Sequence, residues 1–445
     1  MSLNETDPPM KGSDEGIGRG GLFDWLVVLL LLVTSLVSMV DRFALSLLLE
    51  PIKADMALTD AQLGLLTGVA FGLFYATLSL PMGWLADRWS RKATISVGIA
   101  VWGMATAASG IAANALQFAA ARMFVGVGEA ALAPCAYGII HDRFPKHQLG
   151  RAMSVYQMGG MLGAGFAMFV AGIAYDFFLA HQGAPLPLIG GLAPWQQTFL
   201  ALALPCIPVL LLIAAMKEER RPPIVNAPGE APATSLLAAF RADWLFYFAT
   251  FTGVAAVILV TYALLSWMPA ILMREFQWSA VEVGSSYGTL VVIASIAGLV
   301  VGGTSVDLMA RTRIAQPYLV LSLVVALLSL ALVALFGLAS DARMLLVVAA
   351  ALHFVMATPI GIIPAYVQLS SPPAVRGQMS SVYVLAVNIF GQVVGPTAVG
   401  FISSLRPDSP GGLRHAVVIV SSLSLLGAIL LLLVAGRARR PALAS

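Results

Sequence analysis

Residues 83–92 read GWLADRWSRK, an apolar start followed by an acid and a cluster of bases. The skeleton of this stretch, G-x3-D-x3-R, recurs at 303–311. The tripeptide SVY at 154–156 likewise recurs at 381–383, and the offset between the copies grows slightly along the chain, as small insertions would cause. The sequence therefore predicts a duplicated unit with the same topology in both halves, arranged as parallel repeats.

The composition indicates that both halves lie in a membrane. Of the 445 residues, 59% are hydrophobic and 11% are charged, whereas soluble domains carry about 25% charged residues. Apolar runs of about 20 residues are long enough to cross a bilayer as helices. We predict an all-α integral membrane fold with twelve transmembrane helices in two pseudo-symmetric six-helix halves, near 22–50, 61–85, 92–111, 115–140, 148–176, 193–216, 241–275, 281–306, 314–339, 342–369, 374–404 and 413–436.

The polar segments divide the chain into five parts. The long break KEERRPPIVNAPGEAPATS, which starts at residue 217, is rich in charge and proline and predicts a linker. We expect a flexible cytoplasmic tail at 1–21, a six-helix bundle at 22–216, the cytoplasmic linker at 217–240, a second bundle at 241–436 and a cytoplasmic tail at 437–445.

The distribution of bases predicts the orientation. With both termini inside, most Lys and Arg residues fall in cytoplasmic segments, which is the positive-inside asymmetry. The outer loops then hold few bases: Lys53, Arg274, Arg343, Arg406 and Arg414. We therefore expect a multi-pass protein of a bacterial inner membrane.

The loop at 83–92 resembles the signature of the major facilitator superfamily, G-x-L-a-D-r-x-G-R-K, with Ser90 in place of the usual glycine. Serine tolerates a positive φ less readily than glycine, so the turn is expected to differ locally. The resemblance implies a transporter in which the aspartate matching Asp87 holds a cytoplasmic gate closed by facing a helix N-terminus, an interaction of ~0.3–1 kcal/mol. The predicted gate residues are Gly83, Asp87, Arg88, Arg91, Lys92, Asp307 and Arg311.

Four charged residues lie inside predicted spans of the first half: Asp41, Arg42, Arg122 and Glu129. A charge at the bilayer centre costs ~2.5–3.5 kcal/mol on insertion scales, so such residues usually face a cavity and have partners. We expect these four to cluster at a central cavity between the halves.

The segments VDRFALSLL at 40–48 and LTDAQLGLLTG at 58–68 resemble the spinster-like branch of that superfamily. This resemblance implies a proton-linked carrier, and animal members are associated with lysophospholipids and sphingosine-1-phosphate.

The charge distribution gives separate grounds for a similar function. A carboxyl group whose arginine partner moves could bind and release a proton, and arginine suits a planar grip on phosphate or carboxylate. A charged first half facing an apolar second half predicts an amphipathic organic anion as substrate. Further polar candidates for substrate contact are Thr34, Ser38, Tyr156, His353, Asn388 and Gln392.

Alternatives remain open at this stage: a carrier of a small carboxylate metabolite, or a transport-inactive receptor. The sequence contains no recognisable metal spacing, phosphate-binding loop or nucleophile cluster, so we expect neither an enzyme nor a cofactor. The expected partners are the substrate, protons and membrane lipids, with no nucleic acid, and the chain is expected to be a monomer.

Overall fold

The computed structural model describes residues 20–182, 189–217, 235–312, 314, 316–360, 362–372, 375–406, 409 and 411–438. The predicted N-terminal tail (apart from Gly20 and Gly21), most of the linker and nearly all of the C-terminal tail lie outside these residues. The first half contains α1 (Leu22–Met56), α2 (Asp60–Gly64), η1 (Leu65–Leu73), α3 (Phe74–Arg88), α4 (Arg91–Gly110), α5 (Ala115–Glu129), α6 (Leu132–Arg143), α7 (Lys146–Ala180), α8 (Pro194–Ala203) and α9 (Cys206–Ala215).

The second half repeats this arrangement. It contains α10 (Leu236–Ala242), α11 (Trp244–Phe276), α12 (Ala280–Val283), η2 (Gly284–Gly288), α13 (Thr289–Arg311), α14 (Pro317–Gly337), α15 (Ala342–Ala357), α16 (Ile363–Ser370), α17 (Arg376–Val387), η4 (Asn388–Val394), α18 (Gly395–Ser404) and α19 (Gly412–Ala438). Segments η1, η2 and η4 are π-helical turns that continue the α-helices on either side.

Eleven helices within the described residues are long and apolar enough to cross a membrane. The predicted span at 342–369 is divided instead into α15 and α16, with a break near Pro359. Proline has no N–H to donate and its ring clashes with the preceding turn, so it commonly interrupts a helix. The helical membrane fold predicted from the sequence is confirmed.

The turn at Ser90 shows how the motif begins a helix without a glycine. Ser90 has φ −64° and ψ 118°, and its Oγ accepts a 2.9 Å hydrogen bond from the backbone N–H of Ala93. This is an N-cap interaction, which serine makes well. The serine therefore adopts a φ that any residue allows, and it starts α4.

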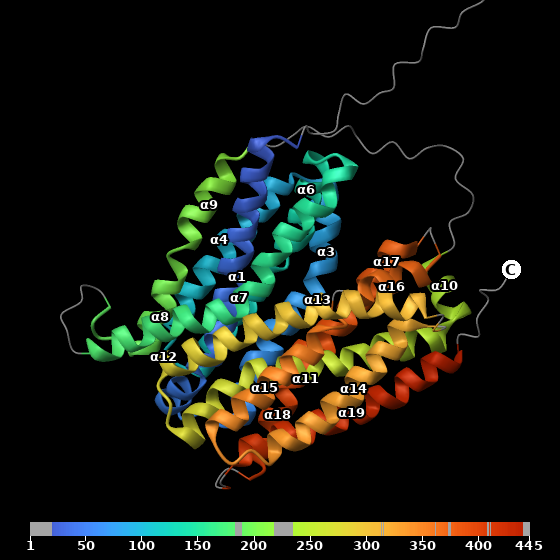
Figure 1. Ribbon diagram of the computed structural model, residues 1–445. Coiled ribbons are helices and arrows are strands. Elements are labelled where there is room, and N and C mark those ends of the chain that lie inside the picture. Colours follow the sequence, from blue (N-terminus) through green and yellow to red (C-terminus); the bar gives the residue numbers. More distant parts are fainter. Residues whose placement is uncertain are drawn as a thin grey trace, which may run out of the picture.

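The two halves converge at one end of the molecule and diverge at the other (Figure 1). We call the end where α1 starts and α19 finishes the terminal face, and the end with the α1–α2 and α11–α12 turns the opposite face. Close contacts between the halves lie toward the opposite face, where the Cα of Gly64 packs against that of Gly400. Near the terminal face, by contrast, a Cβ on Gly303 or Gly377 would meet no described atom within 4 Å.

Two seams join the halves through glycines. In one seam, η1 packs against η4, and a Cβ on Gly68 would lie 2.5 Å from the carbonyl oxygen of Val393. In the other seam, α7 packs against η2, and a Cβ on Gly288 would lie 2.6 Å from the carbonyl oxygen of Gly165. Glycine allows helix backbones to approach this closely because it has no side chain.

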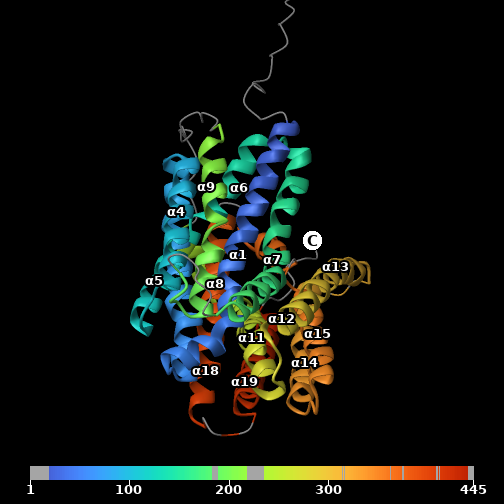
Figure 2. The same ribbon diagram turned by 90° about the vertical axis from the view of Figure 1, so that its left-hand side faces the viewer.

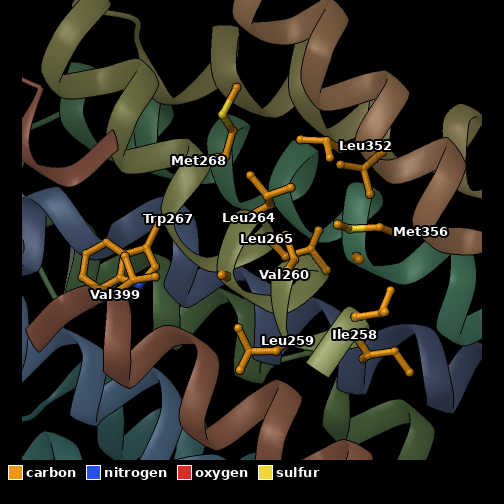
Figure 3. Packing of buried hydrophobic residues seen from close by; sticks show 14 of the residues in the cluster. Ile258, Leu259, Val260, Leu264, Leu265, Trp267, Met268, Leu352, Met356 and Val399 are labelled. Atoms are coloured by element: carbon orange, nitrogen blue, oxygen red, sulfur yellow. The ribbon is translucent and has the colours of Figure 1, made fainter. Parts of the chain in front are cut away.

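Buried apolar side chains of α11 pack against neighbouring helices of the second half (Figure 3). Leu264 and Met268 of α11 are almost completely buried, as are Leu352 and Met356 of α15. Trp267 is fully buried, and its Nε1 donates a 3.0 Å hydrogen bond to the carbonyl oxygen of Pro396 in α18. These contacts join α11 to α15 and α18 within the second half.

The η1–η4 seam gives a first testable prediction. In Gly68→Ala the added methyl group would overlap the backbone of η4, and overpacking of this kind costs about 1–3 kcal/mol. We expect a lower melting temperature in detergent for this variant. Gly427→Ala in α19 serves as the control, because no described atom lies within 4 Å of its added Cβ. Equal melting temperatures for the two variants would contradict the tight seam.

Candidate functional site

Two crossed ion pairs join α1 to α5. Arg42 of α1 donates from Nη2 to Oε2 of Glu129 at 2.7 Å. Arg122 of α5 donates from Nη1 to Oδ1 of Asp41 at 3.3 Å. Each helix thus supplies one acid and one base, and all four predicted intramembrane charges are brought together.

Helix geometry explains the crossing. Asp41 and Arg42 are neighbours, so their side chains leave α1 in directions about 100° apart, whereas Arg122 and Glu129 stand about two turns apart on one face of α5. Glycines between the two charges of α5 let η1 and α4 approach: a Cβ on Gly126 would lie 2.5 Å from the carbonyl oxygen of Phe71.

Arg42 also lies against two aromatic rings. Its guanidinium carbon is 4.7 Å from the ring centre of Phe71 and 4.4 Å from that of Tyr75. Cation–π contacts of this length contribute about 0.5–2 kcal/mol, most where water is excluded. No sequence pattern marks these rings, because aromatic residues are common in apolar helices and carry no spacing signal.

A small cavity of about 20 Å³, enough for a water molecule, lies between the halves at this site. Both arginines line it from the first half, and Tyr262, Ser266 and Gln392 line it from the second half. The two acids, each 1% exposed, stand behind the arginines and do not line this cavity.

Several polar atoms at the site accept or donate no hydrogen bond within the described part of the chain. They are Oδ2 of Asp41, Oε1 of Glu129, the Nε atoms of Arg42 and Arg122, and Oε1 of Gln392. Hydroxyl groups of Thr106 and Ser38 lie beside Asp41 and Glu129, respectively. A site with spare donors and acceptors on both halves can bind a polar group that enters the cavity.

The other predicted contact residues are distributed around this site. Gln392 lines the cavity, and Asn388, one turn away in η4, is buried. Thr34 is buried and donates to the carbonyl oxygen of Leu30 at 2.7 Å. Tyr156 packs edge-on against Tyr137 in the first half.

His353 lies inside the second half rather than along the cavity. Its Nε2 is 2.9 Å from the hydroxyl of Tyr287, and both side chains are buried. The hydrogen bond links α15 to η2 and gives His353 a packing partner.

The predicted gate residues of the first half lie around the α3–α4 turn at the terminal face, and Asp307 and Arg311 lie at the end of α13 in the second half. Arg91 forms a 2.6 Å ion pair with Asp142, and Lys92 donates to the carbonyl oxygen of Ala214 at 3.2 Å. Arg88 stacks over Trp84 at 4.4 Å, Gly83 faces Pro134, and Arg311 is exposed in the last turn of α13. The side chains of Asp87 and Asp307 lie outside the described parts of the structure.

A second charged network joins the halves at the opposite face. Arg274 of α11 donates two hydrogen bonds to Asp60 of α2, at 2.8 and 2.6 Å, and one to Glu50 of α1, at 2.7 Å. Lys53 and Ser403 also donate to Asp60, at 2.7 and 2.6 Å. In the sequence Lys53 and Arg274 resemble ordinary loop charges, since the partners of Arg274 are more than 200 residues away.

Comparisons with known proteins agree with this architecture. The family model described as Major Facilitator Superfamily matches residues 31–396. An MFS-type efflux pump of Mycolicibacterium smegmatis is 27% identical over 94% of each chain. Protein spinster homolog 1 of Xenopus tropicalis is 30% identical over 56% of this chain and 46% of its own length, so the chain matches about half of that relative.

A solved structure is similar along nearly the whole chain. It is a bacterial homolog of the human lysosomal transporter Spinster in an inward-facing, unoccupied conformation, with a TM-score of 0.80 and 23% identity over 95% of this chain and 99% of that one. The fold and the buried charge site therefore define a multi-pass membrane transporter. The chain belongs to the Major Facilitator Superfamily and is similar to its spinster proteins; it is a transporter and not an enzyme.

The opposite-face network gives the second prediction. In Arg274→Gln, Asp60 and Glu50 lose their shared cation, so the closed arrangement of the opposite face loses stability. A loss of about 1.4 kcal/mol would change the ratio of closed to open states tenfold. Spin labels are placed at Met56 and Gln277, one in each half, and the distance between them is measured by double electron–electron resonance. We expect this distance distribution to shift to longer values in Arg274→Gln.

The control for this measurement is Glu275→Gln. Glu275 pairs with Arg414 at 3.2 Å, but both residues belong to the second half. An unchanged distance distribution in Arg274→Gln, or the same change in both variants, would contradict a lock between the halves.

Proposed function

We propose that the chain is a proton-coupled secondary transporter that moves an organic anion with an apolar portion by alternating access. The observation that carries this proposal is the pair of crossed ion pairs beside a cavity that both halves line. Arginine binds carboxylate and phosphate through two parallel hydrogen bonds, so Arg42 and Arg122 are suited to hold an anionic head group.

Proton coupling follows from charge balance. An anion that binds Arg42 would take the place of Glu129, and one that binds Arg122 would take the place of Asp41. The displaced carboxylate would be left in a buried site without its counter-ion, which is costly for a charge. Uptake of a proton removes that charge, so the anion and the proton would bind together.

The composition of the two walls supports an amphipathic substrate. The wall from the first half carries two cations, whereas the second half contributes the uncharged residues Tyr262, Ser266, Gln392 and Pro396. A lysophospholipid or a sphingoid phosphate has this division into an anionic head and an apolar tail.

The proposed orientation places the terminal face in the cytoplasm of a bacterium, in the inner membrane, because the bases of the α3–α4 turn lie there. The six-helix halves at 22–216 and 241–436 would move relative to each other as bodies. The contacts at the opposite face then correspond to an inward-facing arrangement, with Asp87 and the bases around it forming the gate in the other state.

Proteoliposomes with an imposed pH gradient test the coupling. Asp41→Asn permanently resembles the protonated acid, so we expect binding and exchange without a gradient to survive, while accumulation driven by the gradient is lost. Glu129→Gln is expected to behave in the same way if its pair carries the proton. Asp243→Asn, at an exposed position, is the control. Normal accumulation by both buried-site variants would contradict the proposal.

The substrate class is tested in the same vesicles by counterflow. A panel of lysophospholipids, sphingoid phosphates and small carboxylates separates the amphipathic anion from the small metabolite. We expect flux with members of the first two groups. Flux with the small carboxylates alone would reject the lipid-like substrate, and binding of any member without flux would indicate a receptor.

A further inference from the structure

An apolar groove lies on the first half, apart from the charged cavity. It has a volume of about 580 Å³ and runs between α4, α8 and α9; Figure 2 shows these three helices next to one another. Its lining includes Ala100, Gly103 and Ala107 of α4 and Ala201, Cys206 and Ile207 of α8 and α9.

The sequence explains why the groove forms. Gly103 and the two alanines leave the face of α4 without bulk, while the facing helix is broken between α8 and α9 at Leu204 and Pro205. A proline at a helix break prevents the backbone hydrogen bond that would straighten the chain. At Gly103 itself α9 comes close, since a Cβ there would lie 2.8 Å from the Cβ of Cys206. The groove lies beside this contact, where the small side chains of α4 face the break between α8 and α9.

The groove offers an occupant almost no polar partner. Gln197 lines it, but its Nε2 donates to the carbonyl oxygens of Ile189 and Leu192 at 2.8 and 3.1 Å. The thiol of Cys206 accepts a 3.1 Å hydrogen bond from Nε1 of Trp102. Both polar groups are satisfied within the protein, so an occupant with its own polar groups would lose hydrogen bonds on entry.

The rim faces the membrane. Met104, Leu204 and Ile207 line the groove and are 67%, 61% and 57% exposed, and they lie in spans predicted to cross the bilayer. The surroundings of such a surface are lipid tails, which gain dispersion contacts by filling an apolar recess. We propose that this groove is a binding site for one acyl chain of a bilayer phospholipid.

The site lies directly behind the charged cluster. Cys206 lines the groove and accepts a hydrogen bond from Trp102, and the backbone of Trp102 packs against Gly128, the neighbour of Glu129. Thr106, one turn along α4, has its hydroxyl beside Asp41. An acyl chain in the groove thus supports the side of α4 that is turned away from the ion pairs.

Photolabelling of the full chain tests the proposal. The protein is reconstituted in vesicles of phosphatidylethanolamine and phosphatidylglycerol in which some phosphatidylethanolamine carries a diazirine in one acyl chain, and labelled peptides are identified by mass spectrometry. We expect labelling of the wild type to concentrate on the peptides of α4 and α9. In Ala107→Phe the ring fills the groove, and this labelling should fall about tenfold, which corresponds to displacing roughly two methylene groups.

Ala297→Phe provides the matched control, because Ala297 is exposed on α13, away from the groove. It should leave the labelling of α4 and α9 unchanged. Ala201→Phe fills the same groove from α8 and is used in place of Ala107→Phe if that variant does not fold, as judged by its elution and melting temperature. Uniform labelling around the membrane surface, or no decrease in the filling variants, would each overturn the proposal.

Discussion

Two crossed ion pairs between α1 and α5 place four charges inside the membrane-spanning part of the first half, and the helices around them have to accommodate these charges. Four charges in a membrane span would be expensive singly, but here each acid stands against a base and the cluster is neutral. The arrangement is nevertheless incomplete, since Asp41 and Glu129 each keep an oxygen without a hydrogen bond in the described residues. Buried pairs of this kind are a weak source of stability. Their position beside a cavity that both halves line suits the proposed transport, in which the partners of these charges would change.

The contacts between the two halves are of two kinds, close packing at glycines and charged hydrogen bonds. Glycine seams let η1 and η4, and α7 and η2, approach without interlocking side chains, while Arg274 bridges to Asp60 and Glu50 where the halves meet. The opposite face is thus held by specific charged contacts on top of close packing. Few such contacts are described toward the terminal face, where the helices diverge. The Arg274 network and the glycine seams can separate without a rearrangement of the hydrophobic core inside either half.

Much of the fold could be predicted from the sequence because it depends on local composition. The twelve apolar segments, the repeat and the charges inside spans can all be read along the chain, and the helices follow the predicted segments closely. The exceptions are local breaks: before Pro134 between α5 and α6, at Pro205 between α8 and α9, and near Pro359 between α15 and α16. At these positions the sequence stays apolar although the helix is interrupted, since a proline disrupts helical hydrogen bonding without making the segment polar.

The order of residues along the chain indicates a membrane protein with two related halves and four charges inside its spans, because hydropathy and side-chain charge are properties of each residue. Which of these charges meet depends on how the helices pack. Arg42 pairs with Glu129 and not with its neighbour Asp41, because rotation about the helix axis directs adjacent side chains apart. The tertiary structure also brings Arg274 to Asp60, over 200 residues away. Such pairs depend on how helices pack, and no local pattern encodes the partner across a seam.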